Sequence, residues 1–335
     1  MRKEIRVIQY GVGSIGAEIA RLLLQKREVR LVGAVDNDPD KIGWDLGRVA
    51  GVGRDLGVII SDDATQVLKT QADVVIHCTS SCLPDVEKQL MECVDAGHSV
   101  ISTCEELVYP FRKHPHLSNN LDSEATKRKV AILGVGINPG FLMDKLVLTL
   151  ASACQRVNAV EVTRIVDAGC RRLPLQKKIG AGLSLNEFSA LVASGQIKHH
   201  GLPESVAMIA DSLELRVEDI RETIRPVIAR TLFQTSFLEV QPGQVAGICQ
   251  TACGIASGEK VIQLTLQMYV GAENSVDEIR LQGVPALHCR IPGGVHGDVA
   301  TAAVVVNCIP PLLEARPGLR ITRDIPMRYF PTDSQ

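Results

Sequence analysis

The sequence carries no excess of charge of either sign. Its 335 residues include 36 Lys and Arg against 38 Asp and Glu, which gives a formal net charge of −2 and a pI near 6.5. Such a chain has no surplus of basic side chains for a phosphate backbone, and no polybasic tract that would hold it on an anionic membrane. Nucleic acid and membrane partners are therefore not expected.

Long apolar runs are also missing. Arg, Asp, Gln or His interrupts every apolar stretch before it reaches the ~20 residues that cross a bilayer. The first residues lack the apolar core and the small-residue cleavage site of a signal peptide. We therefore expect a cytoplasmic protein.

The ten cysteines lack the spacing of a metal site. Most stand singly in apolar stretches, which is typical of buried reduced thiols. The two closer pairs, Cys78 with Cys82 and Cys249 with Cys253, have no second pair to complete a tetrahedral zinc site. No metal is expected, and the thiols fit a reducing cytoplasm.

What is present indicates two domains of an α/β protein, since 335 residues exceed the usual size of one hydrophobic core. The first part alternates short apolar runs with helical patterns, which is typical of parallel βαβ construction. We predict a first domain with a doubly wound parallel sheet over residues 1–135. Its expected strands are 5–10, 30–35, 73–78, 99–103 and 130–135, and its expected helices are 15–24, 84–96 and 118–129.

After residue 135 the apolar residues alternate with polar ones, which predicts strands of a mainly antiparallel sheet with one wet face. We expect an α+β domain over residues 136–297 for substrate binding and oligomerisation, and a homodimer that buries the wet face. A last helix near 298–313 should return to the first domain, completing it with about 298–330. The expected strands are 159–167, 231–240, 244–252, 260–270, 277–282 and 286–291, and the helices are 184–194, with Ser184 and Glu187 as a capping box, and 203–213.

The segment Gly11-Val12-Gly13-Ser14-Ile15-Gly16 follows the first expected strand and opens the first helix. In that context Gly11 permits a tight turn, Gly13 lets the backbone approach a pyrophosphate, and Gly16 lets helix and strand pack closely. The amides of the helix start, including those of Ser14 and Ile15, would point at the phosphates. The segment therefore predicts that residues 1–135 form an NAD(P)-binding Rossmann domain. The alternative is a glycine-rich turn that binds no ligand.

The second expected strand ends in Asp36, twenty positions after Gly16. An acid there accepts hydrogen bonds from the adenosine ribose and repels a 2′-phosphate, which favours NAD. Asn37 beside it is neutral, and Lys41 and Arg48 follow, so NADP stays open as a cofactor.

Thr79 and Ser80 follow a buried strand, at the edge where open α/β sheets bind ligands. Their hydroxyl groups are candidates for contacts with the ribose and phosphates of the cofactor. Equally, Ser80 can simply cap the helix that begins near residue 84.

Two adjacent acids, Glu105 and Glu106, follow the expected strand 99–103. A carboxylate at this edge can hold an ammonium or iminium group and move a proton while hydride passes to the cofactor. Neighbouring side chains of an extended segment point in opposite directions, so one of the two should enter the site. The alternative is an acid pair at a helix N-terminus.

Asn138 follows the expected strand 130–135 and has both a donor and an acceptor, which suits the nicotinamide carboxamide. Phe141 is a candidate wall of the substrate pocket, and a helix that contains Asp144 should begin here. Asn-Pro-Gly is also a common turn, which is the alternative.

Taken in order, these segments carry a resemblance. The glycine-rich segment, Thr103-Cys104-Glu105-Glu106-Leu107, residues 136–144, residues 171–180 and Gly293-Gly294-Val295-His296-Gly297-Asp298 together resemble the 2,4-diaminopentanoate dehydrogenase family, which includes the native amine dehydrogenases. The first domain is similar to that of dihydrodipicolinate reductase. The resemblance implies oxidative deamination of a primary amine or amino acid to a ketone with NAD or NADP, or reductive amination with ammonia, and an essential glutamate within the Glu105-Glu106 pair.

The resemblance also makes several charged residues of the second domain candidates for the substrate pocket. Any one of the basic side chains can bind a substrate carboxylate, although each is more often solvated, and the histidine can donate to substrate or cofactor. These residues are Arg164, Arg171, Arg172, Lys178 and His296. Two rival functions remain: an oxidoreductase of the dihydrodipicolinate reductase or homoserine dehydrogenase type, and a dinucleotide-sensing protein without catalysis.

Overall fold

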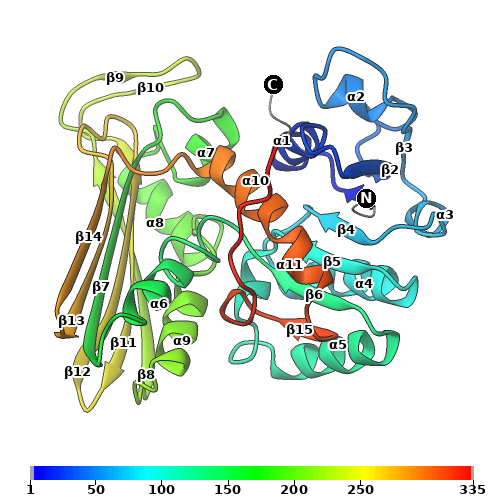
Figure 1. Ribbon diagram of the computed structural model, residues 1–335. Coiled ribbons are helices and arrows are strands. Elements are labelled where there is room, and N and C mark those ends of the chain that lie inside the picture. The colour runs from blue at the N-terminus through cyan, green and yellow to red at the C-terminus, as the bar shows by residue number, and fades with distance from the viewer. Residues whose placement is uncertain (1–3, 333–335) are drawn as a thin grey trace. The chain divides into compact units, whose positions relative to one another are not determined.

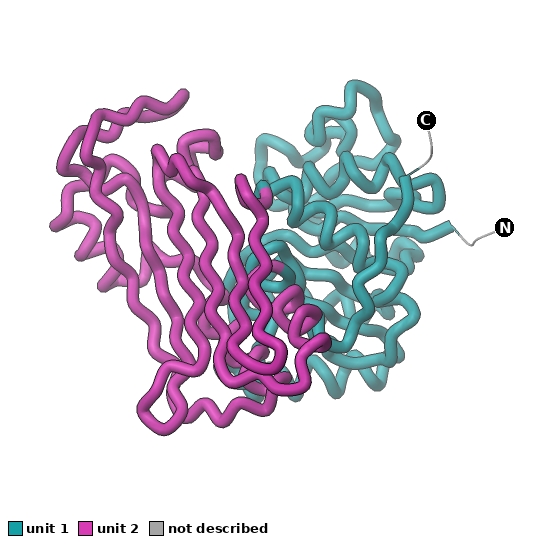
Figure 2. The backbone as a smooth tube through the Cα atoms, turned by 60° about the vertical axis from the view of Figure 1, so that its left-hand side comes forward, with its two compact units in different colours: residues 1–141, 296–335 teal, residues 142–295 magenta. Residues whose placement is uncertain are grey.

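The computed structural model describes residues 4–332. The chain divides into two compact units, and Figure 2 colours them separately. Unit 1 comprises residues 1–141 and 296–335, and unit 2 comprises residues 142–295.

Unit 1 is built on a sheet of seven strands in the order β15-β6-β5-β4-β1-β2-β3, in which every paired strand is parallel to its neighbour (Figure 1). The chain runs outward in opposite directions from β1 and β4, so the strand order reverses between them. Ligands bind at the carboxyl edge of such a reversal. The strands are β1 (Ile5–Tyr10), β2 (Val29–Val35), β3 (Ile60–Ser61), β4 (Val74–His77), β5 (Ser99–Ser102), β6 (Ala131–Gly134) and β15 (Gly318–Arg320).

Helices cover both faces of this sheet, because right-handed crossovers in opposite directions place their helices on opposite faces. In one group, α10 packs against α1, and α11 packs against β5 and β6. In the other group, α4 packs against α5. β4, β5 and β6 are accordingly buried at every residue, as expected for a parallel sheet covered on both faces. The helices are α1 (Ser14–Leu23), α2 (Leu46–Val49), α3 (Ala64–Val67), α4 (Leu83–Asp95), α5 (Pro115–Arg128), α10 (Gly297–Asn307), α11 (Ile309–Leu313) and the 3-10 helices η1 (Glu105–Val108) and η2 (Thr322–Asp324).

Unit 2 contains a second sheet of six strands in the order β14-β13-β7-β12-β11-β8, antiparallel except for the pair β12 and β7. These two sheets confirm the predicted fold class. The strands are β7 (Arg156–Asp167), β8 (Asp219–Ile228), β11 (Val245–Ala256), β12 (Glu259–Tyr269), β13 (Val276–Val284) and β14 (Leu287–Pro292), and the helices are α6 (Lys145–Ala151), α7 (Leu173–Lys178), α8 (Leu185–Ala193) and α9 (Leu202–Ser212).

The two faces of the second sheet differ. α9 packs on β8, β11 and β12, and the inward side chains of β12 are apolar and buried. Figure 2 brings the other face forward and shows its strands with no helix in front of them. This is the wet face that the alternating pattern predicted.

The prediction of a strand at 231–240 is wrong. The structure has a short hairpin there, β9 (Phe233–Gln234) with β10 (Glu239–Val240), and places an unpredicted strand, β8, earlier in the chain. β8 is an edge strand, which explains how it tolerates Pro226 and a largely charged outer face.

Two helix boundaries also differ from the expectation. The helix expected near 298–313 is divided into α10 and α11 at Cys308, because prolines open α11 and lack the N–H that a continuing helix needs. Asp144, expected inside a helix, is the N-cap of α6, where its side chain accepts from the Lys145 amide. The capping box of Ser184 and Glu187 is confirmed at the start of α8.

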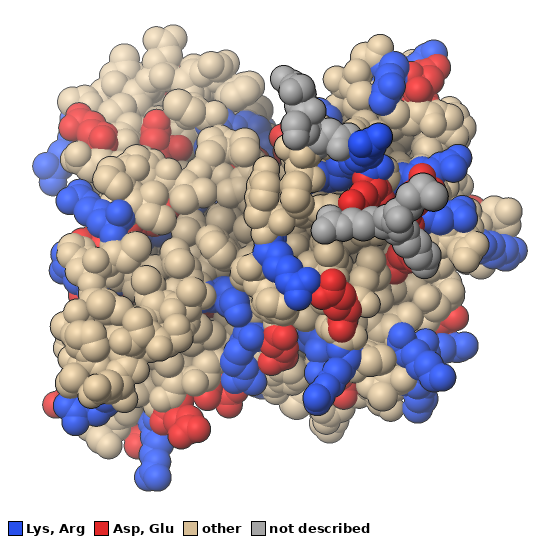
Figure 3. All heavy atoms as spheres, in the orientation of Figure 1, with Lys and Arg blue, Asp and Glu red and all other residues tan. Residues whose placement is uncertain are grey.

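Three features of the described residues can be compared with the composition: the apolar character of the helices, the state of the cysteines and the distribution of surface charge. Within residues 4–332, no helix has both the length and the apolar character that would let it span a membrane. All ten cysteines fall in this range as free thiols. On the face drawn in Figure 3, basic and acidic side chains are interspersed.

Candidate active site

The glycine-rich turn between β1 and α1 has room only for glycine at two of its positions. Gly11 has φ +89°, and a Cβ there would lie 2.3 Å from the carbonyl oxygen of Cys78. A Cβ on Gly16 would lie 2.0 Å from the carbonyl oxygen of Gly11. The turn therefore packs directly against main chain on both sides, as the tight turn and close helix packing predicted from the sequence require.

Gly13 differs from these two glycines. It is the N-cap of α1 with φ −70°, an ordinary angle for any residue, and a Cβ built there meets nothing within 4 Å. Since no side chain caps α1, the amides of its first turn, from Ser14 and Ile15, face the space beside Gly13. This open cradle at a helix N-terminus fits a pyrophosphate.

Asp36 ties the end of β2 to the same turn. Its carboxylate accepts from the Val12 amide at 2.6 Å and from the Asp38 amide at 2.9 Å, and Lys41 Nζ lies 3.5 Å away. Asp36 is buried, whereas Asn37 beside it is exposed. The acid is thus held at the edge of the turn, where a ribose would lie in a Rossmann fold.

A buried polar network lies under the carboxyl end of β4. His77 Nδ1 is 2.9 Å from Ser102 Oγ, and His77 Nε2 is 2.8 Å from Gln89 Oε1 and 3.1 Å from Thr79 Oγ1. Burial lowers the pKa of His77 to about 4, so the imidazole is neutral near pH 7. The network orients the Thr79 hydroxyl, while the Ser80 hydroxyl donates to Asp85 in the first turn of α4.

The two adjacent glutamates after β5 have different surroundings. Glu105 is half-buried, whereas Glu106 has 2% of its surface exposed. The Glu106 carboxylate accepts from the Leu83 amide at 2.9 Å, lies 2.9 Å from His114 Nε2 and forms an ion pair with Lys113. Its charge is therefore buried but matched by three polar groups on two segments of unit 1, the start of α4 and residues 113–114.

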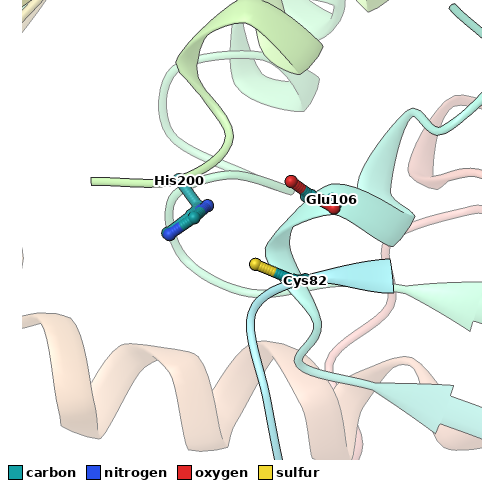
Figure 4. Close-up of side chains that lie close together, drawn as sticks. All are labelled: Cys82, Glu106 and His200. Carbon is teal, nitrogen blue, oxygen red and sulfur yellow. The ribbon is translucent and has the colours of Figure 1, made fainter. Parts of the chain in front are cut away.

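Cys82 lies next to this carboxylate, with its Sγ within 4.8 Å of a Glu106 oxygen, and Figure 4 shows the pair at the start of α4 and on η1. Burial, together with the charge of Glu106, raises the pKa of the Cys82 thiol. The third side chain drawn there, His200, belongs to unit 2.

Asn138 follows β6 at the same edge of the sheet. Its amide nitrogen and amide oxygen are both buried, and neither has a hydrogen-bond partner within the described chain. A buried amide that lacks both partners costs free energy unless a ligand supplies a donor and an acceptor. The nicotinamide carboxamide does so, which fits the role predicted for Asn138.

The remaining predicted pocket residues fall in both units. Phe141 is half-buried in unit 1, and His296 is the N-cap of α10, with Nδ1 3.5 Å from the Val299 amide. In unit 2, Arg164 is buried, pairs with Asp277 at 2.5 Å and donates to the Val295 carbonyl. Of the other basic candidates in unit 2, Arg171 is buried, and Arg172 and Lys178 are exposed.

The sequence did not predict the roles of three further residues. Lys113 and His114 contact Glu106, and their position seven and eight residues after it gives no local pattern. In unit 2, buried Gln250 binds both the main-chain amide and the carbonyl of His199. Burial and the charges of Lys178 and Arg164 lower the pKa of His199 to about 3.

Unit 1 thus gathers the glycine-rich turn, Asp36, Thr79, Glu106 and Asn138 at the carboxyl edge of one parallel sheet, because the strands that precede them are all parallel. A Rossmann sheet that has an open helix N-terminus and a buried carboxylate at one edge is the arrangement expected of an oxidoreductase on this fold.

Family models specify this class further. The model for the dihydrodipicolinate reductase N-terminus matches residues 5–104, and the model for the 2,4-diaminopentanoate dehydrogenase C-terminal domain matches residues 141–332. The chain belongs to the 2,4-diaminopentanoate dehydrogenase family.

Individual relatives agree with the family. The chain is 28% identical to 2,4-diaminopentanoate dehydrogenase of Acetoanaerobium sticklandii, over 97% of this chain and 94% of that protein. It is 22% identical to an amine dehydrogenase of Streptomyces virginiae, over 97% of each chain. The solved structure of the amine dehydrogenase from Mycobacterium smegmatis is 28% identical, with a TM-score of 0.87 over 98% of each chain. The chain is accordingly an NAD(P)-dependent oxidoreductase acting on CH–NH2 groups.

The open space at Gly13 yields a paired test. We expect Gly13→Ala to leave the melting temperature nearly unchanged but to weaken NADH binding at least tenfold, because the methyl group would occupy only the cofactor's space. Gly16→Ala should instead lower the melting temperature, because its methyl group would overlap the Gly11 carbonyl. Fluorescence titration with NADH and thermal unfolding measure the two effects. Normal NADH affinity in folded Gly13→Ala would contradict the placement of the pyrophosphate.

Proposed function

We propose that the protein oxidises a small primary amine or amino acid to the ketone and ammonia with NAD or NADP, and aminates the ketone in the reverse direction. The observation that carries this proposal is the buried, ion-paired carboxylate of Glu106 at the sheet edge that also holds the dinucleotide cradle. A fixed anion in a site of low dielectric is suited to stabilise an ammonium or iminium group.

Each part of unit 1 has a separate task in this reaction. The first turn of α1 binds the pyrophosphate, Asp36 the ribose, and Asn138 the carboxamide, which together orient the nicotinamide. The cofactor, when bound, accepts or donates the hydride. Glu106 holds the substrate nitrogen and accepts the proton that the ammonium loses as the iminium forms; water then adds to the iminium and ammonia leaves.

Glu106 rather than Glu105 is the glutamate that we assign to this chemistry. Electrostatic stabilisation is stronger where water is excluded, and Glu106 is buried whereas Glu105 is half-buried. Lys113 and the Leu83 amide also favour the charged form of Glu106, which is the form that binds a cation.

For the substrate pocket we keep the residues predicted from the sequence as proposals. Arg164 already has Asp277 as its partner, so binding of a substrate carboxylate falls more naturally to a different basic side chain. The proposed pocket residues are Phe141, Arg164, Arg171, Lys178 and His296.

The two glutamates provide the direct mutational test. Glu106→Gln should lower kcat by about 100- to 10,000-fold, because a neutral amide neither accepts the proton nor stabilises the cation. Glu105→Gln is the matched control and should stay within about threefold of the wild type. Steady-state kinetics with an accepted amine, together with NADH titration to show intact cofactor binding, give the result. Near-normal kcat in Glu106→Gln would remove Glu106 from the chemistry.

We further propose that the uncovered face of the unit 2 sheet pairs with a second copy to form a homodimer. One row of this face is uncharged and in register across four strands: Thr223, Thr251, Thr265 and Thr163. Burying this row, together with neighbouring cysteine and glutamine side chains, costs less free energy of desolvation than burying charged residues would. The ten free thiols likewise support a cytoplasmic location, which cell fractionation can check.

Sedimentation analysis tests the dimer and the face together. We expect the wild type, whose chain mass is 36.2 kDa, to sediment with twice that mass. Thr265→Arg, at the centre of the face, should shift it to the monomer through charge repulsion between the copies. Thr126→Arg, on α5 of unit 1, is the control and should not. A wild-type monomer, or a dimer unaffected by Thr265→Arg, would contradict the proposal.

A further inference from the structure

The proposed reaction releases one proton in each turnover, and this proton has to leave a buried site. An ammonium substrate gives up a hydride to the cofactor and a proton to Glu106, and addition of water to the iminium then yields ketone and ammonium. Glu106, with 2% of its surface exposed, must return to its charged form before the next turnover. The inference below rests on the proposed function.

His114 connects this carboxylate to the surface. Its Nε2 lies 2.9 Å from Glu106 Oε2, and its side chain is 14% exposed compared with 3% for that of Glu106. The residue is the N-cap of α5, and its carbonyl accepts from both the amide and the hydroxyl of Ser118, at 2.9 and 2.7 Å. The imidazole is therefore presented from an anchored main chain, with one nitrogen on the buried acid.

Two more titratable side chains of unit 1, Lys113 and Cys82, lie against Glu106. A lysine ammonium ordinarily loses its proton only near pH 10.4, so it suits the role of fixed positive partner. The raised pKa of Cys82 keeps that thiol protonated. The imidazole of His114 has two nitrogens that can each carry a proton, which suits transfer from one side to the other.

We infer that His114 is the proton relay between Glu106 and solvent. With the proton of neutral His114 on Nδ1, the Glu106 O–H bond breaks as His114 Nε2 takes the proton with its lone pair, and the imidazolium then releases the proton on Nδ1 to water. Proton exchange with water, loss from Nε2 and gain at Nδ1, restores the starting tautomer before the next turnover. In reductive amination the same steps run in reverse and return a proton to Glu106. Lys113 remains protonated throughout and holds the carboxylate in place.

Two substitutions at His114 separate relay from structural support. His114→Gln keeps an N–H that can donate to Glu106 but cannot exchange a proton, and we expect kcat to fall about 100-fold with unchanged NADH affinity. The kcat of His114→Ala should fall by a similar factor, and added imidazole should restore it in proportion to the imidazole concentration. The matched control is His116→Gln, because His116 is exposed on the same helix and should leave kcat unchanged.

The experiment uses the full chain, a saturating amine and one fixed pH, with a series of substituted imidazoles as rescue bases. A rescue that depends on the pKa of the added base supports the relay, because a merely structural role would not respond to it. Normal kcat in His114→Gln, or no rescue of folded His114→Ala, overturns the relay. Amine turnover by the wild type keeps the proposed function intact in those cases, whereas its absence defeats the proposed function itself.

Discussion

The close approach of main chain at Gly11 is the constraint on which the cofactor half of the site depends. A Cβ on Gly11 would lie 2.3 Å from the carbonyl oxygen of Cys78, which directly follows β4. The turn after β1 therefore has no space for a side chain at this position. This contact fixes where α1 begins, and Asp36 then secures the turn by accepting from the Val12 amide. Only with the turn so placed does Gly13 leave an open cradle at the helix N-terminus.

The chemical half depends on the burial of one charge. Removing the Glu106 carboxylate from water costs free energy. The Leu83 amide of α4, Lys113 and His114 offset this cost in place of solvent. These donors come from segments that join at the carboxyl edge of the same parallel sheet. The fold thus places a buried anion at the sheet edge where we propose that the nicotinamide binds, and the same burial creates the need for a route by which protons leave.

Features encoded by a few neighbouring residues were predictable from the sequence. The glycine-rich turn, the parallel and antiparallel sheets and the capping box at Ser184 are of this kind, because spacing and alternation carry their signal. β8 was missed because an edge strand needs few apolar residues, and its arginines and Pro226 hid the pattern. The contacts of Lys113 and His114 with Glu106 depend on tertiary packing, so no local signal could reveal them.

The most direct test of the account is a spectrophotometric comparison of matched substrates. Small primary amines and amino acids, and the hydroxy compounds of the same carbon skeletons, would each be incubated with NAD and with NADP while nicotinamide absorbance is followed. The account predicts reduction of the cofactor by at least one amine, its oxidation by the matching ketone with ammonia, and no turnover of the hydroxy compounds, because a buried carboxylate stabilises a cationic ammonium or iminium group and not a neutral alcohol. Oxidation of hydroxy compounds with no activity on any amine would contradict it.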